Sequence, residues 1–154
     1  MPERFTTNCT SVASGTDKAL INLFNPAAAP TSRGGIYEID VGSVATPADQ
    51  AAHFNVHRTT AVGTEGSGLV PANIDPGGPA GAYDSGIGAF SVQPTETAAK
   101  IMLSFPLNQR ATYRWVAAPE CEIWMAATQN NGCDLKTLSS TSTQTHCATL
   151  FFVE

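Results

Sequence analysis

Short runs of alternating apolar and polar residues restrict the fold of this chain more than any other feature of its sequence. In the run Ile36–Val41 (IYEIDV), Ile39 and Val41 alternate with the acidic residues Glu38 and Asp40. A period of two is typical of a β-strand, because successive side chains point to opposite faces. Similar runs recur along the chain, separated by Gly, Pro and Asn. The pattern predicts an all-β protein of eight or nine short strands with at most one or two helical turns.

The composition agrees with one turn-rich β domain. The 154 residues include 13 glycines and 10 prolines, and 42% are hydrophobic, which is enough to fill one core. Two packed antiparallel sheets are the natural arrangement for so many short strands. We therefore expect an antiparallel β-sandwich, with a jelly roll as the favoured topology and an open barrel as the alternative.

Three neighbouring runs in the second half of the chain predict a local meander of antiparallel strands. The runs are Lys100–Phe105, Leu107–Pro119 and Cys121–Met125. In the middle run Tyr113 and Trp115 share one face, and we interpret them as core or inter-sheet residues. The alternative is that the side carrying Arg110 and Arg114 faces a partner protein.

Two long segments have too few apolar residues to pack a core. We interpret Met1–Asp17 as an extended N-terminal arm that lies on a neighbouring subunit, and residues 18–154 as the sandwich domain. Ala61–Ser85 contains six glycines and three prolines. A loop of this length in a compact domain is usually functional or disordered. We expect it to project from the sandwich, with Leu69–Ile74 as an edge strand.

We predict that these irregular segments bind partner proteins. Ordering them costs roughly 1–2 kcal/mol per residue in backbone entropy, which a partner surface can offset. The candidate partner-binding residues are Phe5 and Val12 on the arm, Leu69, Val70, Ile74 and Tyr83 on the long loop, and Arg110 and Arg114 on the central run.

Charge and hydropathy disfavour two classes of partner. The net charge is −5, and the eight Lys and Arg residues form no cluster, so direct nucleic-acid binding is not expected. No run of 18 apolar residues predicts a membrane span. The first 18 residues are polar and do not resemble a secretory signal.

The sequence predicts no catalytic, cofactor-binding or metal-binding residues. His53 and His57 would form a metal pair on a helix, but on a strand they are roughly 13 Å apart, too far to share one ion. Glu38 and Asp40 could bind calcium, but a solvated strand face is the simpler interpretation because no third ligand accompanies them. The glycine-rich segments lack the patterns of phosphate loops and nucleophile elbows.

The four cysteines, Cys9, Cys121, Cys133 and Cys147, include no CxxC pair, so a zinc ribbon is not expected. We interpret them as free thiols in a reducing cytosol. The alternative is a disulfide between Cys133 and Cys147 on neighbouring strands, formed in oxidising surroundings.

Four segments of the chain resemble capsid decoration proteins, also called cement proteins, of tailed bacteriophages. They are Tyr37–Gly42 (YEIDVG), His53–Gly66 (HFNVHRTTAVGTEG), Leu107–Pro119 (LNQRATYRWVAAP) and Ala126–Ser140 (AATQNNGCDLKTLSS). The resemblance covers roughly residues 35–154 and leaves out the N-terminal segment. Its motifs are structural, the cysteines are not part of them, and no catalytic residue is carried over.

The resemblance implies a non-enzymatic virion protein that is made in the host bacterial cytoplasm. It would bind the major capsid protein on the outer capsid surface and bridge neighbouring capsomers. We expect a homotrimer, with a dimer as the alternative, because closed symmetry buries sheet edges. A receptor- or carbohydrate-binding jelly roll is the alternative function, with Trp124 and Tyr83 as candidate stacking residues. A cupin-type enzyme would need a cluster of histidines, and the three here are scattered.

Overall fold

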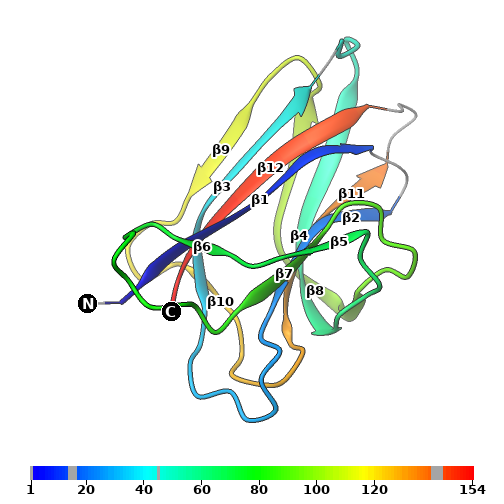
Figure 1. Cartoon of the computed structure of the whole chain (residues 1–154). Coiled ribbons are helices and arrows are strands. Elements are labelled where there is room, and N and C mark those ends of the chain that lie inside the picture. The colour runs from blue at the N-terminus through cyan, green and yellow to red at the C-terminus, as the bar shows by residue number, and fades with distance from the viewer. Residues whose placement is uncertain (1, 14–16, 45, 140–143) are drawn as a thin grey trace.

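The computed structural model describes residues 2–13, 17–44, 46–139 and 144–154, and these form twelve β-strands (Figure 1). The strands are β1 (Arg4–Ala13), β2 (Lys18–Phe24), β3 (Gly35–Val44), β4 (Ala51–Ala61), β5 (Ser67–Leu69), β6 (Ala72–Asn73), β7 (Asp84–Ile87), β8 (Thr95–Asn108), β9 (Tyr113–Val116), β10 (Ile123–Trp124), β11 (Gly132–Ser139) and β12 (Thr145–Val153). In this part of the chain no helix is long and apolar enough to cross a membrane.

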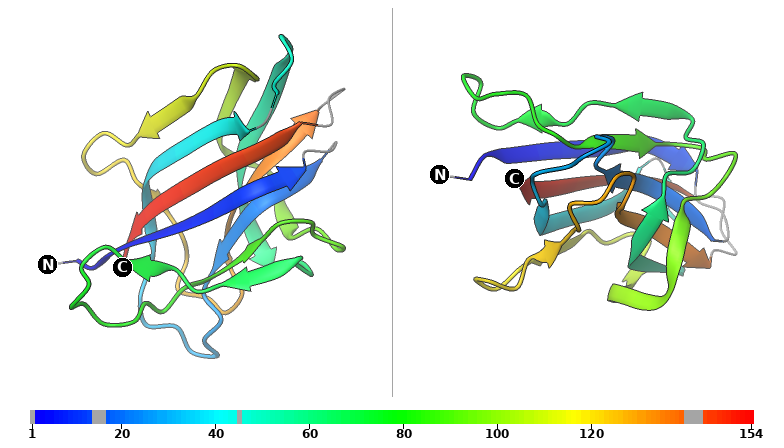
Figure 2. Two further views of the ribbon diagram at one scale, coloured as in Figure 1. Left: turned by 45° about the horizontal axis from the view of Figure 1, so that its top comes forward. Right: turned by 90° about the horizontal axis from the view of Figure 1, so that it is seen from below.

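The strands form two antiparallel sheets that pack against each other (Figure 2). Sheet A has the order β10-β3-β12-β1-β6, and β9 also pairs with β3. Sheet B has the order β5-β7-β2-β11-β4-β8. The prediction of an all-β antiparallel sandwich is therefore confirmed, whereas the jelly-roll topology stays a prediction.

The core lies between the sheets, and alternate residues of the sheet A strands fill it from one side. In β12 the residues Ala148, Leu150 and Phe152 are buried, while the residues between them are only partly buried. Aromatic rings link the strands: the ring centroids of Phe5 and Phe152 are 5.5 Å apart, and so are those of Phe54 and Phe105. The alternation seen in the sequence is thus the alternation between core and surface.

Residues Arg4–Ala13 of the expected N-terminal arm form a strand of the sandwich, so the expectation of an arm separate from the domain is wrong for this part of it, while residues 1 and 14–16 lie outside the described residues. Strand β1 pairs with β12 on one side and with β6 on the other. Its inward face carries Phe5, Thr7 and Cys9, all at most 1% exposed. One threonine and one cysteine beside a single phenylalanine give a weak apolar signal. The Thr7 hydroxyl nevertheless bonds the Ser85 hydroxyl at 2.6 Å, which satisfies this polar group inside the protein.

The meander expected between residues 100 and 125 is also wrong. Strand β8 pairs with β4 in sheet B, whereas β9 and β10 both pair with β3 in sheet A. The chain therefore changes sheets after β8. Tyr113 and Trp115 do pack against the core, as predicted, and the Tyr113 ring stacks on Phe105 with a centroid distance of 4.0 Å.

His146, at the start of β12, makes the stability of the sandwich depend on pH. It is buried, with its ring edge against Phe54 and its Nδ1 3.1 Å from the Ser43 hydroxyl. Burial lowers the pKa of His146 below its ordinary value of 6.5, because the charged form would lose its hydration.

We expect His146 to destabilise the fold as the pH falls below 6.5. There the unfolded chain binds a proton that the folded chain does not, so the free energy of unfolding decreases, by at most about 1.4 kcal/mol per pH unit. Urea denaturation at pH 7.5 and pH 5.5 should show a smaller pH effect for His146→Gln than for the wild type. An equal pH effect in both proteins would contradict this assignment.

Candidate functional site

The segment 61–83, called the clasp below, joins β4 to β7 and runs along the edges of both sheets. Its strand β5 pairs with β7 at the edge of sheet B, and its strand β6 pairs with β1 at the edge of sheet A. The edge strand expected over Leu69–Ile74 is thus two short strands, one in each sheet, separated by Val70 and Pro71.

The clasp holds apolar side chains in solvent. Val70 is 71% exposed and Ile74 is 48% exposed, while Leu69 is half-buried. Leu69 and Val70 line one hollow of about 160 Å³, and Ile74 lines a groove of about 460 Å³ next to Glu3 and Arg4. Three of the residues predicted to bind a partner therefore lie on the clasp, in two separate hollows.

Phe5 and Tyr83, by contrast, cannot contact a partner because they belong to the core. Phe5 is 1% exposed and Tyr83 is 0% exposed. The Tyr83 ring packs edge-on against Phe152 at 5.8 Å, and its hydroxyl accepts a hydrogen bond from the Gly34 N–H at 2.8 Å. Burial also excludes Tyr83 as a stacking residue for sugars. These two aromatics anchor the clasp and do not form its binding face.

Hydrogen bonds from its own chain hold the clasp in place. The Glu154 carboxylate accepts hydrogen bonds from the N–H groups of Ala82 and Tyr83, at 2.8 and 3.1 Å. The Asn73 side chain bonds the Pro79 carbonyl and accepts from the Asp75 N–H, both at 2.9 Å. Because side chains replace partner contacts here, the exposed residues are held in place before any binding.

The two arginine candidates lie far from the clasp. Arg114 is on β9, at the edge of sheet A opposite to β6. Its Nε is 2.6 Å from a Glu38 oxygen and 3.9 Å from an Asp40 oxygen. The Arg110 side chain is exposed and approaches the Pro47 carbonyl at 3.4 Å. The eighth candidate, Val12, pairs through its backbone with His146, and its side chain lies outside the described part of the structure.

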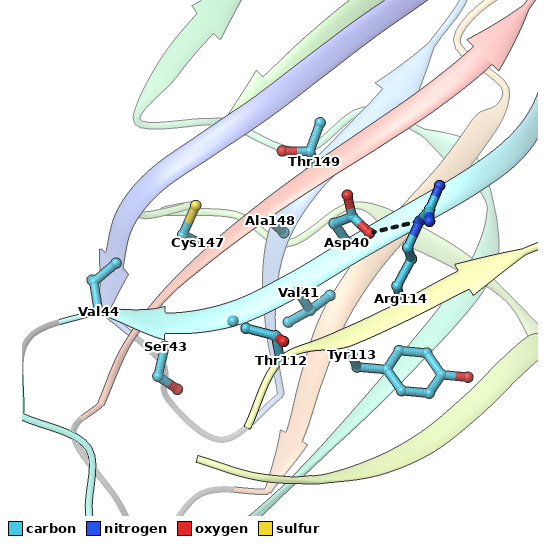
Figure 3. Close-up of a pocket in the computed structure, with 11 residues that line it drawn as sticks. Asp40, Val41, Ser43, Val44, Thr112, Tyr113, Arg114, Cys147, Ala148 and Thr149 are labelled. Carbon is cyan, nitrogen blue, oxygen red and sulfur yellow. Dashed lines mark ion pairs between the residues drawn. The ribbon is translucent and has the colours of Figure 1, made fainter. Parts of the chain in front are cut away.

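A shallow groove of about 480 Å³ follows the outer face of sheet A next to Arg114 (Figure 3). Strands β3, β9 and β12 line it, and Figure 3 shows Asp40 and Arg114 pointing toward each other across its rim. Burial and the Glu38 carboxylate raise the pKa of Asp40, while Arg114 opposes that rise. Glu38 and Asp40 thus share the outer strand face, as predicted, and Arg114 lies between them and solvent.

Sheet B contains a buried polar row that sequence reasoning missed. Asn22, Asp134 and His57 lie directly opposite one another on β2, β11 and β4. They are on the face turned away from sheet A, because the alternate β11 residues Cys133 and Leu135 are in the core. No signal in one sequence distinguishes such residues from an ordinary solvated strand face.

Two further side chains complete the polar row. Glu96, at the start of β8, places Oε2 3.8 Å from His57 Nε2, and Asp134 Oδ1 lies 3.5 Å from His57 Nδ1. Lys136 contacts Glu96 Oε1 and lies 2.6 Å from an Asp17 oxygen. Burial raises the pKa of Asp134, and the neighbouring His57 partly opposes this. The row therefore places one carboxylate next to each nitrogen of the His57 imidazole.

The strand assignment of His53 and His57 is confirmed, because both lie in β4. His53 Nε2 is 2.7 Å from the Ser104 hydroxyl, whereas His57 lies in the polar row. The two histidines therefore have different partners.

The four cysteines are free thiols, so the possible Cys133–Cys147 disulfide is wrong. Cys133 is buried in β11 of sheet B, while Cys147 is half-buried in β12 of sheet A. Burial raises the pKa of Cys9 and of Cys133 to about 12 in each case, whereas Cys121 is exposed.

We expect the thiols to differ widely in reactivity, because only the thiolate attacks disulfide reagents. In the native protein at pH 8, a disulfide reagent should label Cys121 first and Cys147 more slowly. Cys9 and Cys133 should react only after unfolding in guanidinium, when all four thiols become available. Peptide mapping identifies the labelled residues, and rapid native labelling of Cys133 would contradict the packing of β11.

Comparison with known proteins does not assign the chain to a family. No protein-family model matches it, and no curated protein matches it significantly.

Proposed function

We propose that the protein is a non-enzymatic decoration protein of a tailed-bacteriophage virion. It binds the major capsid protein on the outside of the head and bridges neighbouring capsomers. The four sequence segments that resemble decoration proteins support this proposal, and so does the β-sandwich fold that the resemblance implies. All four segments supply strands of the two sheets, namely β3, β4, β9 and β11.

The observation that carries the proposal is the exposure of Val70 and Ile74 on an ordered clasp. Apolar side chains fixed in solvent bind a partner at low entropic cost. Acidic side chains predominate around them: Glu65 and Asp84 line the hollow beside Val70, and Glu3 and Asp75 line the groove beside Ile74 together with Arg4. An apolar centre with an acidic rim fits a capsid surface that carries lysine or arginine.

Self-association is the second part of the proposal. Strand β8 has 14 residues and lies at the end of sheet B, so one of its edges is unpaired within the described chain. Ile101 and Met102 on this strand are 51% and 38% exposed. A long edge strand with exposed apolar residues favours pairing with another copy. We propose that β8 forms the subunit interface of a homotrimer, with a dimer as the alternative.

The test is co-sedimentation of the purified protein with tailed-phage heads that lack their decoration protein. We expect the wild type to bind and the double variant Val70→Asp/Ile74→Asp to bind at least tenfold more weakly, since each charge would be placed at a desolvated contact. The control is Val92→Asp, which changes a valine that is 59% exposed outside the clasp. Equal binding of the wild type and the double variant would contradict the role of the clasp.

A further inference from the structure

The polar row in sheet B contains a concentration of buried acceptor atoms without partners. Within the described residues, neither carboxylate oxygen of Asp134 has a hydrogen-bond partner, and Asp134 is 1% exposed. The same is true of Asn22 Oδ1, Asn55 Oδ1 and His57 Nδ1. Buried polar groups are almost always paired, so unpaired acceptors collected in one place call for a positive group.

A divalent cation fits this place better than a proton or a water molecule does. A proton on His57 Nδ1 would pair that atom with Asp134 Oδ1 but would leave Asp134 Oδ2 and the two amide oxygens unpaired, and a water molecule donates only two hydrogen bonds. A metal ion accepts lone pairs from carboxylate, imidazole and amide oxygen together. One ligand atom each from His57, Glu96 and Asp134 already lies within 4.8 Å of the other two. In a tetrahedral site an ion about 2.0–2.2 Å from each donor needs donors about 3.3–3.6 Å apart, so side-chain rotations must bring the donors closer by about 1 Å.

The surroundings of His57 can hold its ring in the tautomer that binds a metal. Asn55 Nδ2 is 3.4 Å from His57 Nε2, while Asn55 Oδ1 has no partner among the described residues. Exchanging the two ends of the amide lets Oδ1 accept a hydrogen bond from Nε2–H. The lone pair of Nδ1 then points at Asp134, and a cation between them removes the repulsion between two acceptors.

We propose that His57, Glu96 and Asp134 bind one structural divalent metal ion, and that Zn²⁺ fits this donor set best. One imidazole with two carboxylates is a set that zinc accepts, and Asn22 Oδ1 supplies a fourth donor in the same row. Lys136 holds Glu96 Oε1, and Glu96 Oε2, which lies 3.8 Å from His57 Nε2, must turn toward the Nδ1 side of the ring to reach the ion. The histidine pair considered from the sequence is not the site, because the ligands come from three different strands.

The ion would tie the irregular part of β8 to the sheet. Between β4 and β8 the register passes from His57↔Ile101 to Thr59↔Glu96, so one intervening residue on β4 faces four on β8. Glu96 lies at the far side of this bulge, and His57 and Asp134 lie on β4 and β11. A metal joining these three residues fixes the bulge without a backbone ladder.

In the experiment, wild-type protein is first unfolded in guanidinium that contains a chelator. The guanidinium and the chelator are then removed, and the protein is refolded with or without ZnCl₂. After gel filtration, plasma mass spectrometry should find one zinc per chain. The midpoint of thermal unfolding should rise by about 5–10 °C when free Zn²⁺ is ~100-fold above its Kd. Mn²⁺ should give a smaller rise and Ca²⁺ none.

Two variants at the site and two controls decide the ligands. Asp134→Asn and His57→Gln should lose both the retained zinc and the thermal response. Asp134→Asn keeps the volume and removes a buried charge, so its metal-free form should fold. Asp40→Asn removes a carboxylate on the outer face of sheet A, and Cys121→Ser/Cys147→Ser removes the accessible thiols. Both controls should retain one zinc.

Several results would overturn the proposal. The first is that the wild type retains no zinc and its midpoint of thermal unfolding does not change. The second is that Asp134→Asn and His57→Gln still retain zinc. The third is that Cys121→Ser/Cys147→Ser loses it. Co²⁺ gives an independent readout, because a site of nitrogen and oxygen donors lacks the near-ultraviolet charge-transfer band of a thiolate ligand. Appearance of that band in the wild type would assign the metal to cysteine and contradict the site.

Discussion

Replacing Gly132 with alanine is expected to lower the free energy of unfolding by about 3 kcal/mol or more. Gly132 begins β11, which lies between β2 and β4, and it pairs with Phe24 on one side and Thr59 on the other. A Cβ atom at this position would lie 1.8 Å from the Leu23 carbonyl oxygen and 2.8 Å from the Phe24 Cα. Both atoms are backbone, so the clash can be relieved only by separating two paired strands.

The control is Gly68→Ala in β5. Its nearest neighbour would be the flexible Glu65 side chain at 3.7 Å, an ordinary contact. In guanidinium denaturation, the free energy of unfolding should fall strongly for Gly132→Ala and change by no more than about 0.5 kcal/mol for Gly68→Ala. Similar stabilities of the two variants would contradict the close pairing of β11 with β2.

Replacing Phe152 with alanine should cost about 3–5 kcal/mol, the usual range for deleting a buried ring. Phe152 is 0% exposed and lies between Phe5 on β1 and Tyr83 at the end of the clasp. The cavity would therefore loosen the N-terminal strand and the clasp together. We also expect proteolysis within the segment 61–83 to accelerate in this variant.

The adjacent residue provides a matched control, because Phe151 has the same side chain on the opposite face of β12. It is only partly buried and meets Tyr37 at 6.2 Å. Phe151→Ala should cost about 1 kcal/mol and leave the clasp resistant to protease. An equal loss of stability in both variants would contradict the assignment of one face of β12 to the core and the other to the surface.

The sequence predicts strands well where one face is apolar, and less well where inward positions are polar. Alternation in Ile36–Val41 identifies β3 because Ile39 and Val41 fill the core. It misses β1, whose inward Thr7 bonds Ser85 on a strand 78 residues away. The partners of a strand also depend on contacts across the whole chain. A regular period between residues 100 and 125 therefore could not show that β8 and β9 belong to different sheets.

The residues of the candidate site also fall into those that the sequence could predict and those that it could not. Exposed Val70 and Ile74 could be foreseen, because a segment rich in glycine and proline cannot bury them. Tyr83 could not be placed from the sequence, since a lone aromatic in such a segment looks alike whether it anchors the segment or binds a partner. The polar row was beyond prediction because His57, Glu96 and Asp134 approach one another only after three strands have paired.

Surface analysis of virions purified from the source of this sequence tests the proposed function most directly. Intact particles treated with protease should release peptides of this chain, and a reconstruction of the shell should show the sandwich on its outside with the clasp against the capsid surface. The proposal predicts many copies arranged with the symmetry of the lattice. Particles that lack the protein, or that carry it only on tail structures, would contradict the assignment as a decoration protein.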